Sequence, residues 1–380
     1  MKRIICTLAL LCLMTVQVSA VELDIGGKSA LLMDVATGTV LYEKNADEAL
    51  APASVTKVMT MLLIMEAVDS GKIRMEDTVT ASEAAASKGG SQIFLKVGET
   101  MSVADMLKSI AVSSANDCAC AMAEHIAGSE SAFVEMMNTR AKELGMQDTH
   151  FVNCTGLDDD PEAASHLTCA RDIGIMSREL MKHHPDIKKF TTIWMDTVRN
   201  GTFGLSNTNK LIRFYPGATG LKTGFTSGAG YCLSATAERE GMELIAVVMG
   251  CSTSQERTAA CKAMLDYGFA NFALVSPDLT ELSTSVPVKL GKETGISAVL
   301  GAETEMLVEK GKKSEVTTEV ALAESVTAPV SKGQNLGTMT VKAGDQVLAE
   351  VPLVAAEDVP RLTWWDLFVK VLRKAAMAKG

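Results

Sequence analysis

The chain has 380 residues, a formal net charge of −10 at pH 7 and 47% hydrophobic residues. This length predicts two domains, or one large domain with additions, and the apolar content is sufficient for a large core. The acidic balance argues against nucleic acid as a partner.

Residues 1–20 have the composition of a secretory signal peptide. Lys2 and Arg3 provide the positive start, residues 4–14 are mainly apolar, and small residues at 18–20 allow cleavage after Ala20. A short uncleaved membrane anchor is the alternative, but the small-residue site favours cleavage. We therefore expect the protein to be secreted across the cytoplasmic membrane.

The cysteines do not form the pattern of a disulfide framework or a metal site. Seven follow the predicted signal peptide, an odd number at scattered spacings, which favours small buried side chains over a complete set of disulfides. The chain has no Cys-x-x-Cys or His-Glu-x-x-His pattern, and its five histidines are dispersed. We expect neither a metal ion nor another cofactor. These seven are Cys118, Cys120, Cys154, Cys169, Cys232, Cys251 and Cys261.

The first predicted elements are a hairpin and a buried helix. Residues 29–34 and 39–43 are strand-like and flank a turn. The apolar run that follows Lys57 has no clean polar face, which indicates a helix buried on most sides. Because Pro52 disfavours helix in the residue before it, this helix should begin near Ser54.

Ser54 and Lys57 are three residues apart and would share one face of this helix. The unpaired N–H groups and the dipole at a helix N-terminus favour negative charge. A hydroxyl beside an amine at this place is therefore a candidate activated nucleophile. The alternative is an ordinary capping serine followed by a lysine in the first turn. Ser-x-x-Lys alone does not decide between these readings.

From residue 75 to residue 275 the pattern is mixed. Two strand-like runs, 230–237 and 243–250, precede the last helix of this region. With the hairpin at 29–43, the first domain therefore has strands at its beginning and near its end, and helices between and after them. That order predicts an α+β domain over residues 21–275, with its terminal strands in one antiparallel sheet. We further expect a short strand at 92–95, a polar loop at 151–160, and helices at 103–110, 118–126, 131–145, 170–181 and 254–265.

The remaining chain has two different characters. Residues 276–356 lose helical periodicity, and the runs 316–322 and 337–354 alternate as strands do, which predicts a small β-rich domain. Residues 361–380 place Trp364, Trp365 and Phe368 on one broad helical face and basic residues on the other.

This last segment is too often interrupted to span a bilayer. Its tryptophans and basic face favour an amphipathic helix on a membrane surface, here the outer face of the cytoplasmic membrane. Docking on the protein itself or on a twin subunit is the alternative.

Three short motifs occur along the chain in one order, namely Ser54-x-x-Lys57, Ser114-Ala115-Asn116 and Lys222-Thr223-Gly224. Together they match the motif set of penicillin-binding proteins and class A β-lactamases. Over essentially its whole length the chain resembles the D-alanyl-D-alanine carboxypeptidases among the low-molecular-mass penicillin-binding proteins. This resemblance implies a β-lactamase/transpeptidase-like domain, in which helices flank an antiparallel sheet, followed by a small β domain and a C-terminal anchor.

The resemblance also implies a function. It is the removal of the terminal D-alanine from peptidoglycan stem pentapeptides through an acyl-enzyme on Ser54, and penicillins and other β-lactams would acylate the same serine. Lys57 would accept the serine proton, with Lys222 as the neighbouring positive charge. Ser114 would relay a proton to the departing D-alanine.

The remaining roles concern substrate binding. Asn116 would hydrogen-bond the substrate backbone and help position Lys57, and the strand that contains Gly224 would pair with the extended peptide. Thr223 and Arg257 would receive the terminal carboxylate. The backbone N–H groups of Ser54 and Phe225 would form the oxyanion hole. His166 lies where the family has a histidine near the site, which is expected to order its loop rather than do chemistry.

Two other functions are compatible with the same motifs. They are a D,D-endopeptidase that cuts cross-links and a non-catalytic penicillin-binding protein that binds the cell wall. A class A β-lactamase is disfavoured, because no acidic residue at 158–162 can be assigned the role of the deacylating glutamate.

Overall fold

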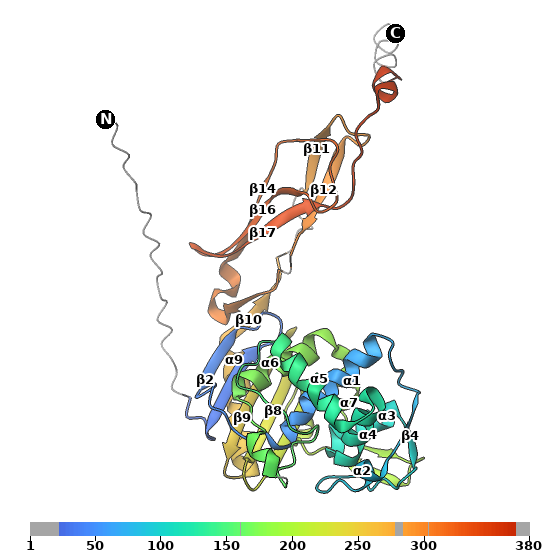
Figure 1. Cartoon of the computed structure of the whole chain (residues 1–380). Helices are drawn as coiled ribbons and strands as arrows, with labels where there is room; N and C mark the ends of the chain where they lie inside the picture. The colour runs from blue at the N-terminus through green and yellow to red at the C-terminus, as the bar shows by residue number, and fades with distance from the viewer. Residues whose placement is uncertain (1–22, 160, 278–283, 303, 370–380) are drawn as a thin grey trace, which may run out of the picture.

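The computed structural model describes residues 23–159, 161–277, 284–302 and 304–369. Figure 1 shows a mixed body of helices and strands and, above it, an elongated part made mainly of strands. The predicted signal peptide and the last part of the C-terminal segment lie outside the described residues.

A five-stranded sheet with the order β2-β1-β9-β8-β7 is the centre of the larger part. Neighbouring strands are antiparallel throughout. The predicted hairpin and the shared sheet of first and last strands are therefore confirmed, and the fold is α+β. The strands are β1 (Ser29–Asp34), β2 (Val40–Lys44), β7 (Ala218–Thr226), β8 (Gly230–Arg239) and β9 (Met242–Cys251).

Both faces of this sheet are buried, because alternate residues of its central strands enter different cores. Leu31 of β1 and Val247 of β9 face the helical layer that contains α1 (Lys57–Asp69). Leu32 and Leu244 face the opposite core under α9 (Ser254–Asn271). The other helices are α2 (Glu83–Ala86), α3 (Val103–Ser113), α4 (Asn116–Ala127), α5 (Glu130–Glu143), α6 (Ala170–His183), α7 (Lys188–Thr191) and α8 (Leu211–Phe214).

Helix α1 is buried on nearly all sides, as its sequence predicts, and it packs against α6, α4 and α3. Its start differs from the prediction. Residues Ala53–Thr56 form a 3₁₀ turn, and the α-helix begins only at Lys57. Ala53 has a positive φ of 49°, so the chain bends sharply just before Ser54.

The prediction of a strand at residues 92–95 is wrong. These residues form an irregular loop, and the carboxylate of Asp117 accepts hydrogen bonds from the N–H groups of Ile93 and Leu95. Phe94 between them has a left-handed backbone with φ 60°, so the segment turns at this residue and is not a regular strand. Two short pairs were not predicted here, β3 (Thr78–Thr80) with β4 (Thr100–Ser102) and β5 (Met195–Val198) with β6 (Phe203–Ser206).

The elongated part contains a six-stranded sheet of order β14-β16-β17-β12-β11-β15 with its own core. The predicted strand run 337–354 is a hairpin of two strands. A separate pair, β10 (Phe272–Val275) with β13 (Met306–Glu309), joins the end of α9 to this part of the chain. The sheet strands are β11 (Ser285–Lys289), β12 (Gly295–Leu300), β14 (Val316–Leu322), β15 (Val326–Thr327), β16 (Asn335–Ala343) and β17 (Gln346–Ala355).

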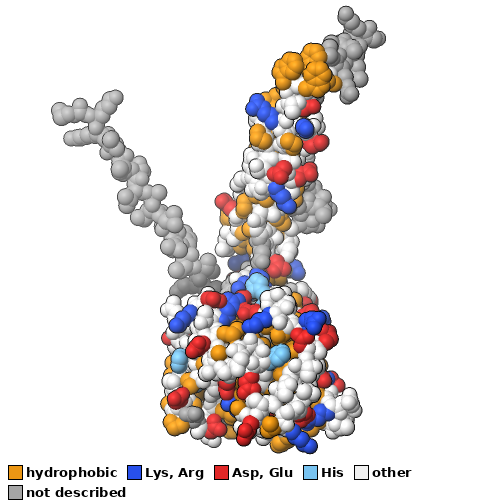
Figure 2. Space-filling model, turned by 45° about the vertical axis from the view of Figure 1, so that its right-hand side comes forward, with side chains coloured by type: hydrophobic (Ala, Val, Ile, Leu, Met, Phe, Trp, Pro, Cys, Tyr) orange, Lys and Arg blue, Asp and Glu red, His pale blue; other side chains and the backbone are white. Residues whose placement is uncertain are grey.

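The C-terminal helix is described only over residues 364–369. Trp364 and Trp365 are 73% and 64% exposed, and both lie against Phe368. Figure 2 shows them as an apolar cluster at the far tip of the elongated part. No helix in the described ranges is long and apolar enough to cross a bilayer.

Candidate active site

The amine of Lys57, at the first position of α1, donates a hydrogen bond to the Ser54 hydroxyl over 2.8 Å. The 3₁₀ turn brings the two side chains together, and Ser54 remains partly exposed. The same amine donates to the Thr155 carbonyl oxygen over 2.8 Å. Lys57 is therefore held between a potential nucleophile and a fixed backbone acceptor.

Burial lowers the pKa of Lys57 from its ordinary value to about 7, although Cys154 and the carboxylate of Asp117 act in the opposite direction. The side chain is completely excluded from solvent. A lysine amine with such a pKa is neutral in a large fraction of molecules near neutral pH. It can then accept a proton from a neighbouring hydroxyl.

Lys222 of β7 is the second buried amine of the site. Burial lowers its pKa well below the ordinary value, and the charges of Lys57 and Arg257 lower it further. Its amine donates to the Thr223 carbonyl oxygen over 2.9 Å. Because a proton on either amine disfavours one on the other, the two titrate as a pair, and the lowered pKa of Lys222 does not support the positive charge predicted for it.

Ser114 and Asn116 lie where α3 ends and α4 begins. Ser114 has a left-handed backbone conformation with φ 62°, which is uncommon for a residue with a side chain. The Asn116 amide group donates to the Gly89 carbonyl oxygen over 2.8 Å. Within the described ranges, Ser114 Oγ and Asn116 Oδ1 are buried without a hydrogen-bond partner. Both atoms therefore have unused hydrogen-bonding capacity, which is uncommon for buried polar groups.

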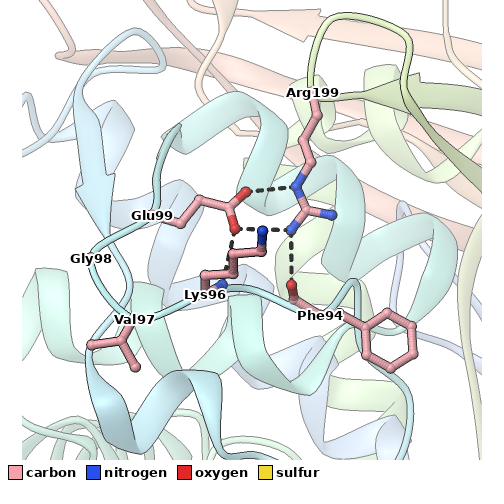
Figure 3. Close-up of a pocket in the computed structure, with 6 residues that line it drawn as sticks. All are labelled: Phe94, Lys96, Val97, Gly98, Glu99 and Arg199. Carbon is pink, nitrogen blue, oxygen red and sulfur yellow. Dashed lines mark hydrogen bonds and ion pairs between the residues drawn. The ribbon is translucent and has the colours of Figure 1, made fainter.

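The loop that contacts Asn116 is fixed from its other side by Arg199. This guanidinium donates to the carbonyl oxygens of Ile93 and Phe94 and forms an ion pair with Glu99 at 2.6 Å. Figure 3 shows the contacts of Arg199 with Phe94 and Glu99 beside a pocket of about 480 Å³. Arg199 was not predicted, because nothing in its local sequence indicates that it binds a loop about a hundred residues away.

On the opposite side, β7 lies directly against the Ser54 turn because residue 224 is glycine. A Cβ at this position would lie 2.7 Å from the Pro52 carbonyl oxygen and 3.1 Å from the Val55 nitrogen. The next residue, Phe225, is half exposed, and the centre of its ring lies 4.3 Å from that of Tyr231 of β8, with the two rings tilted by 31°. The third motif thus lies next to the first.

The two residues predicted to receive a carboxylate are both near the end of β7. Thr223 is 6% exposed, and its hydroxyl lies 2.6 Å from that of Thr208. Arg257 of α9 donates to the carbonyl oxygens of Gly224 and Cys232 at 3.1 and 3.3 Å. Its Nε is buried and has no partner in the part of the chain that the structure describes.

His166 binds the protein itself. Its Nδ1 accepts the Val152 N–H at 3.1 Å, so Nε2 carries the proton and donates to the Thr56 hydroxyl at 2.8 Å. That hydroxyl donates in turn to the Ala53 carbonyl oxygen. Burial, followed by the charges of His150 and Lys57, lowers the pKa of His166 to about 4. These are the contacts of a residue that orders the Ser54 turn.

The loop before His166 supplies contacts that the sequence analysis missed. Asn153 Oδ1 accepts the N–H groups of Thr155 and Gly156 and so fixes the carbonyl group that binds Lys57. A Cβ on Gly156 would lie 1.8 Å from the Ala53 carbonyl oxygen, and its φ is 81°. Only glycine permits this approach. The Asn-x-x-Gly pattern of residues 153–156 is the sequence feature from which this turn could have been predicted.

One group of potential metal ligands, Asp47, Asp148 and Cys169, occurs among the described residues. Asp47 already pairs with Arg171 at 2.6 Å, and the Cys169 sulfur accepts the Asp172 N–H. Two of the three potential ligands therefore already bind other groups of the protein. All seven cysteines after the predicted signal peptide are buried as free thiols, in line with their expected structural role.

Comparison with known proteins agrees with this geometry. A family model described as D-alanyl-D-alanine carboxypeptidase matches residues 15–253, and one described as penicillin-binding protein 5, C-terminal domain, matches residues 269–361. The chain is 46% identical to D-alanyl-D-alanine carboxypeptidase DacF of Bacillus subtilis, over 90% of this chain and 87% of that protein. It is 33% identical to DacC of Escherichia coli, over 88% and 85%.

Solved structures give the same result. Penicillin-binding protein 5 from Haemophilus influenzae superposes with a TM-score of 0.74 at 33% identity, over 89% of this chain and 98% of that one. Penicillin-binding protein D2 from Listeria monocytogenes in its ampicillin-bound form has a TM-score of 0.57 at 33% identity, over 65% and 99%. The chain belongs to the D-alanyl-D-alanine carboxypeptidase family of penicillin-binding proteins.

Proposed function

We propose that Ser54 is the nucleophile of this serine-type D-alanyl-D-alanine carboxypeptidase and that Lys57 is its base. The observation that carries this assignment is the 2.8 Å hydrogen bond between the Ser54 hydroxyl and a fully buried amine whose pKa is lowered to about 7. A deprotonated Lys57 accepts the serine proton as Oγ attacks a carbonyl carbon.

The reaction proceeds in two halves. Ser54 Oγ bonds to the carbonyl carbon of the penultimate D-alanine, and the backbone N–H groups of Ser54 and Phe225 stabilise the oxyanion. The C–N bond then breaks, and Ser114 relays the proton that Lys57 accepted to the nitrogen of the departing D-alanine, which returns Lys57 to its neutral form. Water hydrolyses the ester on Ser54, which regenerates the hydroxyl and releases the shortened peptide.

Peptide binding uses the free edge of the central sheet. β7 is the last strand in the order β2-β1-β9-β8-β7, so its outer edge offers backbone groups to an extended peptide. On the facing side, Asn116 Oδ1 accepts a substrate N–H. Thr223 supplies a hydroxyl and Arg257 a cation for the terminal carboxylate, whose negative charge would favour the protonated form of Lys222 beside it. His166 acts only through the Ser54 turn.

The substrate is the peptidoglycan stem pentapeptide, and β-lactams acylate the same serine. The ampicillin-bound relative supports the second statement. Of the alternatives, a D,D-endopeptidase has support in one relative, named D-alanyl-D-alanine endopeptidase, from Pseudomonas aeruginosa, which is 34% identical over 55% of this chain. A cross-linked dimer peptide as substrate separates the two activities.

The protein acts outside the cytoplasm. We infer that it has a cleaved signal at residues 1–20, a catalytic domain at 21–275, a β domain at 276–356 and a peripheral membrane helix at 361–380 on the outer face of the cytoplasmic membrane. The exposure of Trp364 and Trp365 supports membrane contact, because aromatic rings prefer the interface. Vesicles that contain anionic lipid should bind the chain, and deletion of residues 361–380 should abolish that binding.

The assignment of the nucleophile is tested by the release of D-alanine from diacetyl-Lys-D-Ala-D-Ala. Ser54→Ala should remove this activity, whereas the control Ser70→Ala, at the far end of α1, should keep it. Activity that persists in Ser54→Ala refutes the assignment. If labelled penicillin binds to the unaltered protein and no D-alanine is released, the protein is instead a non-catalytic wall-binding relative.

A further inference from the structure

Thr208 connects the two walls of the site, although none of the three motifs contains it. Its hydroxyl lies 2.6 Å from the Thr223 hydroxyl of β7. Its backbone N–H donates to the Val112 carbonyl oxygen over 3.1 Å, in the last turn of α3 and two residues before Ser114. A single residue thus contacts the strand with Lys222 and the turn that presents Ser114.

Two buried amides fix the backbone on either side of Thr208. Asn207 and Asn209 are 6% and 3% exposed. The Asn207 amide group donates to the Ile193 carbonyl oxygen over 2.8 Å, and that of Asn209 donates to the Gly220 carbonyl oxygen on β7 over 2.7 Å. Asn207 Oδ1 also accepts the Asn209 N–H. Thr208 is exposed, but the buried neighbours on either side of it hold its backbone in place.

The hydroxyl pair has one proton to spare. Each threonine carries one hydroxyl hydrogen, and the bond between Thr208 and Thr223 uses one of the two. Within the described ranges, no other hydrogen-bond partner of either hydroxyl is found. When Thr208 donates, Thr223 becomes an acceptor, its own hydrogen is free, and its strength as a donor rises because hydrogen bonds in a chain polarise one another.

We propose that Thr208 is a positioning residue for recognition of the substrate's terminal carboxylate. It donates to Thr223 and so directs the Thr223 hydrogen outward, toward an anionic acceptor. This inference rests on the proposed role of Thr223. A carboxypeptidase substrate differs from an amidated or extended peptide in its free C-terminal carboxylate. Part of the enzyme's preference for that carboxylate then depends on the Thr208 hydroxyl, which lies outside the three motifs.

The test compares kcat/KM for diacetyl-Lys-D-Ala-D-Ala with that for the same peptide carrying a C-terminal amide. Thr208→Val keeps the shape of the side chain and should lower the acid-to-amide preference about tenfold, since one hydrogen bond to a charged acceptor is weakened. Thr208→Ser should restore the preference to within about twofold of the unaltered enzyme. The control Thr192→Val alters an exposed threonine whose hydroxyl binds only its own helix.

The variant Thr223→Val distinguishes a failure of the role proposed for Thr208 from a failure of the role proposed for Thr223. If Thr223→Val lowers the preference and Thr208→Val does not, the role of Thr208 is wrong while that of Thr223 stands. If Thr223→Val leaves the preference unchanged, the carboxylate role of Thr223 is wrong, and the inference falls with it. An equal loss on acid and amide in Thr208→Val indicates a purely structural role and also overturns the proposal.

Discussion

Lys57 donates a 2.8 Å hydrogen bond to Ser54 although no part of the lysine side chain reaches solvent. The relationship combines two properties that are rarely found together, since a buried amine resists charge and a hydroxyl needs a base close by. The Thr155 carbonyl oxygen holds the amine in place. The apolar helix α1 therefore sets the protonation state of the base as well as its position.

The acylation rate should rise with pH through an apparent pKa of about 7. Below this value the Lys57–Lys222 pair carries an additional proton, and Lys57 cannot accept one from Ser54. The measurement is the second-order rate of labelling by a fluorescent penicillin from about pH 5 to pH 9. A rate that stays constant down to pH 5 contradicts the role of Lys57 as base.

Lys57→Met should abolish acylation without destabilising the fold. The folded pKa of Lys57 is depressed, so between about pH 7 and 10.5 the unfolded chain binds more protons, and burial of this amine lowers stability at neutral pH. Methionine fills a similar volume without that penalty. We expect activity to fall at least about a thousandfold while Tm stays equal or rises.

The control for this variant is Lys72→Met, an exposed lysine just past α1, which should change neither quantity. A Tm several degrees lower in Lys57→Met would show that the two hydrogen bonds of this amine outweigh its burial.

His166 should make stability dependent on acid. Its folded pKa of about 4 lies below its unfolded value of 6.5, so the unfolded chain binds more protons between these values and stability falls as pH falls through that window. The loss amounts to about 3 kcal/mol of unfolding free energy. Urea unfolding at pH 7 and at pH 4 measures it.

His166→Asn should flatten this pH dependence, while His125→Asn, at an exposed position, should keep it. If both variants lose stability toward acid as the unaltered protein does, carboxyl groups rather than His166 are responsible.

Gly224→Ala should slow acylation by about a hundredfold, because a Cβ 2.7 Å from the Pro52 carbonyl oxygen forces β7 away from the Ser54 turn. The matched control is Gly204→Ala in β6, where an added Cβ has open space and φ is not positive. Penicillin labelling rates of both variants decide the matter. Equal rates would mean that the contact between strand and turn is not required.

The sequence predicts the general design well and the supporting contacts poorly. The hairpin of β1 and β2, the buried helix α1 and the shared sheet follow from periodicity, because each pattern reports burial directly. Ser54, Lys57 and Lys222 follow from the order of the motifs. By contrast, the Thr155 carbonyl group belongs to the backbone, and any residue carries one.

The errors have physical causes as well. Residues 92–95 are strand-like in sequence, and Ile93 and Leu95 are buried while Phe94 is exposed. However, Phe94 has a left-handed backbone, and the N–H groups on either side of it bind the carboxylate of Asp117 in place of a partner strand. Helix α9 continues to Asn271, past the end predicted at residue 265. Gly268 lies inside the helix and does not end it. A glycine occurs there because Leu244 approaches so closely that a side chain would have no room.

Mass spectrometry after exposure to penicillin tests the central claim most directly. The intact protein should gain the mass of one penicillin, and proteolysis should locate the adduct on the peptide that contains Ser54. Ser54→Ala should gain no mass. The control is Ser113→Ala, at the residue just before the Ser114-Ala115-Asn116 motif, and it should be labelled like the unaltered protein. An adduct on any other residue, or one that forms in Ser54→Ala, would contradict the assignment of Ser54 as the nucleophile.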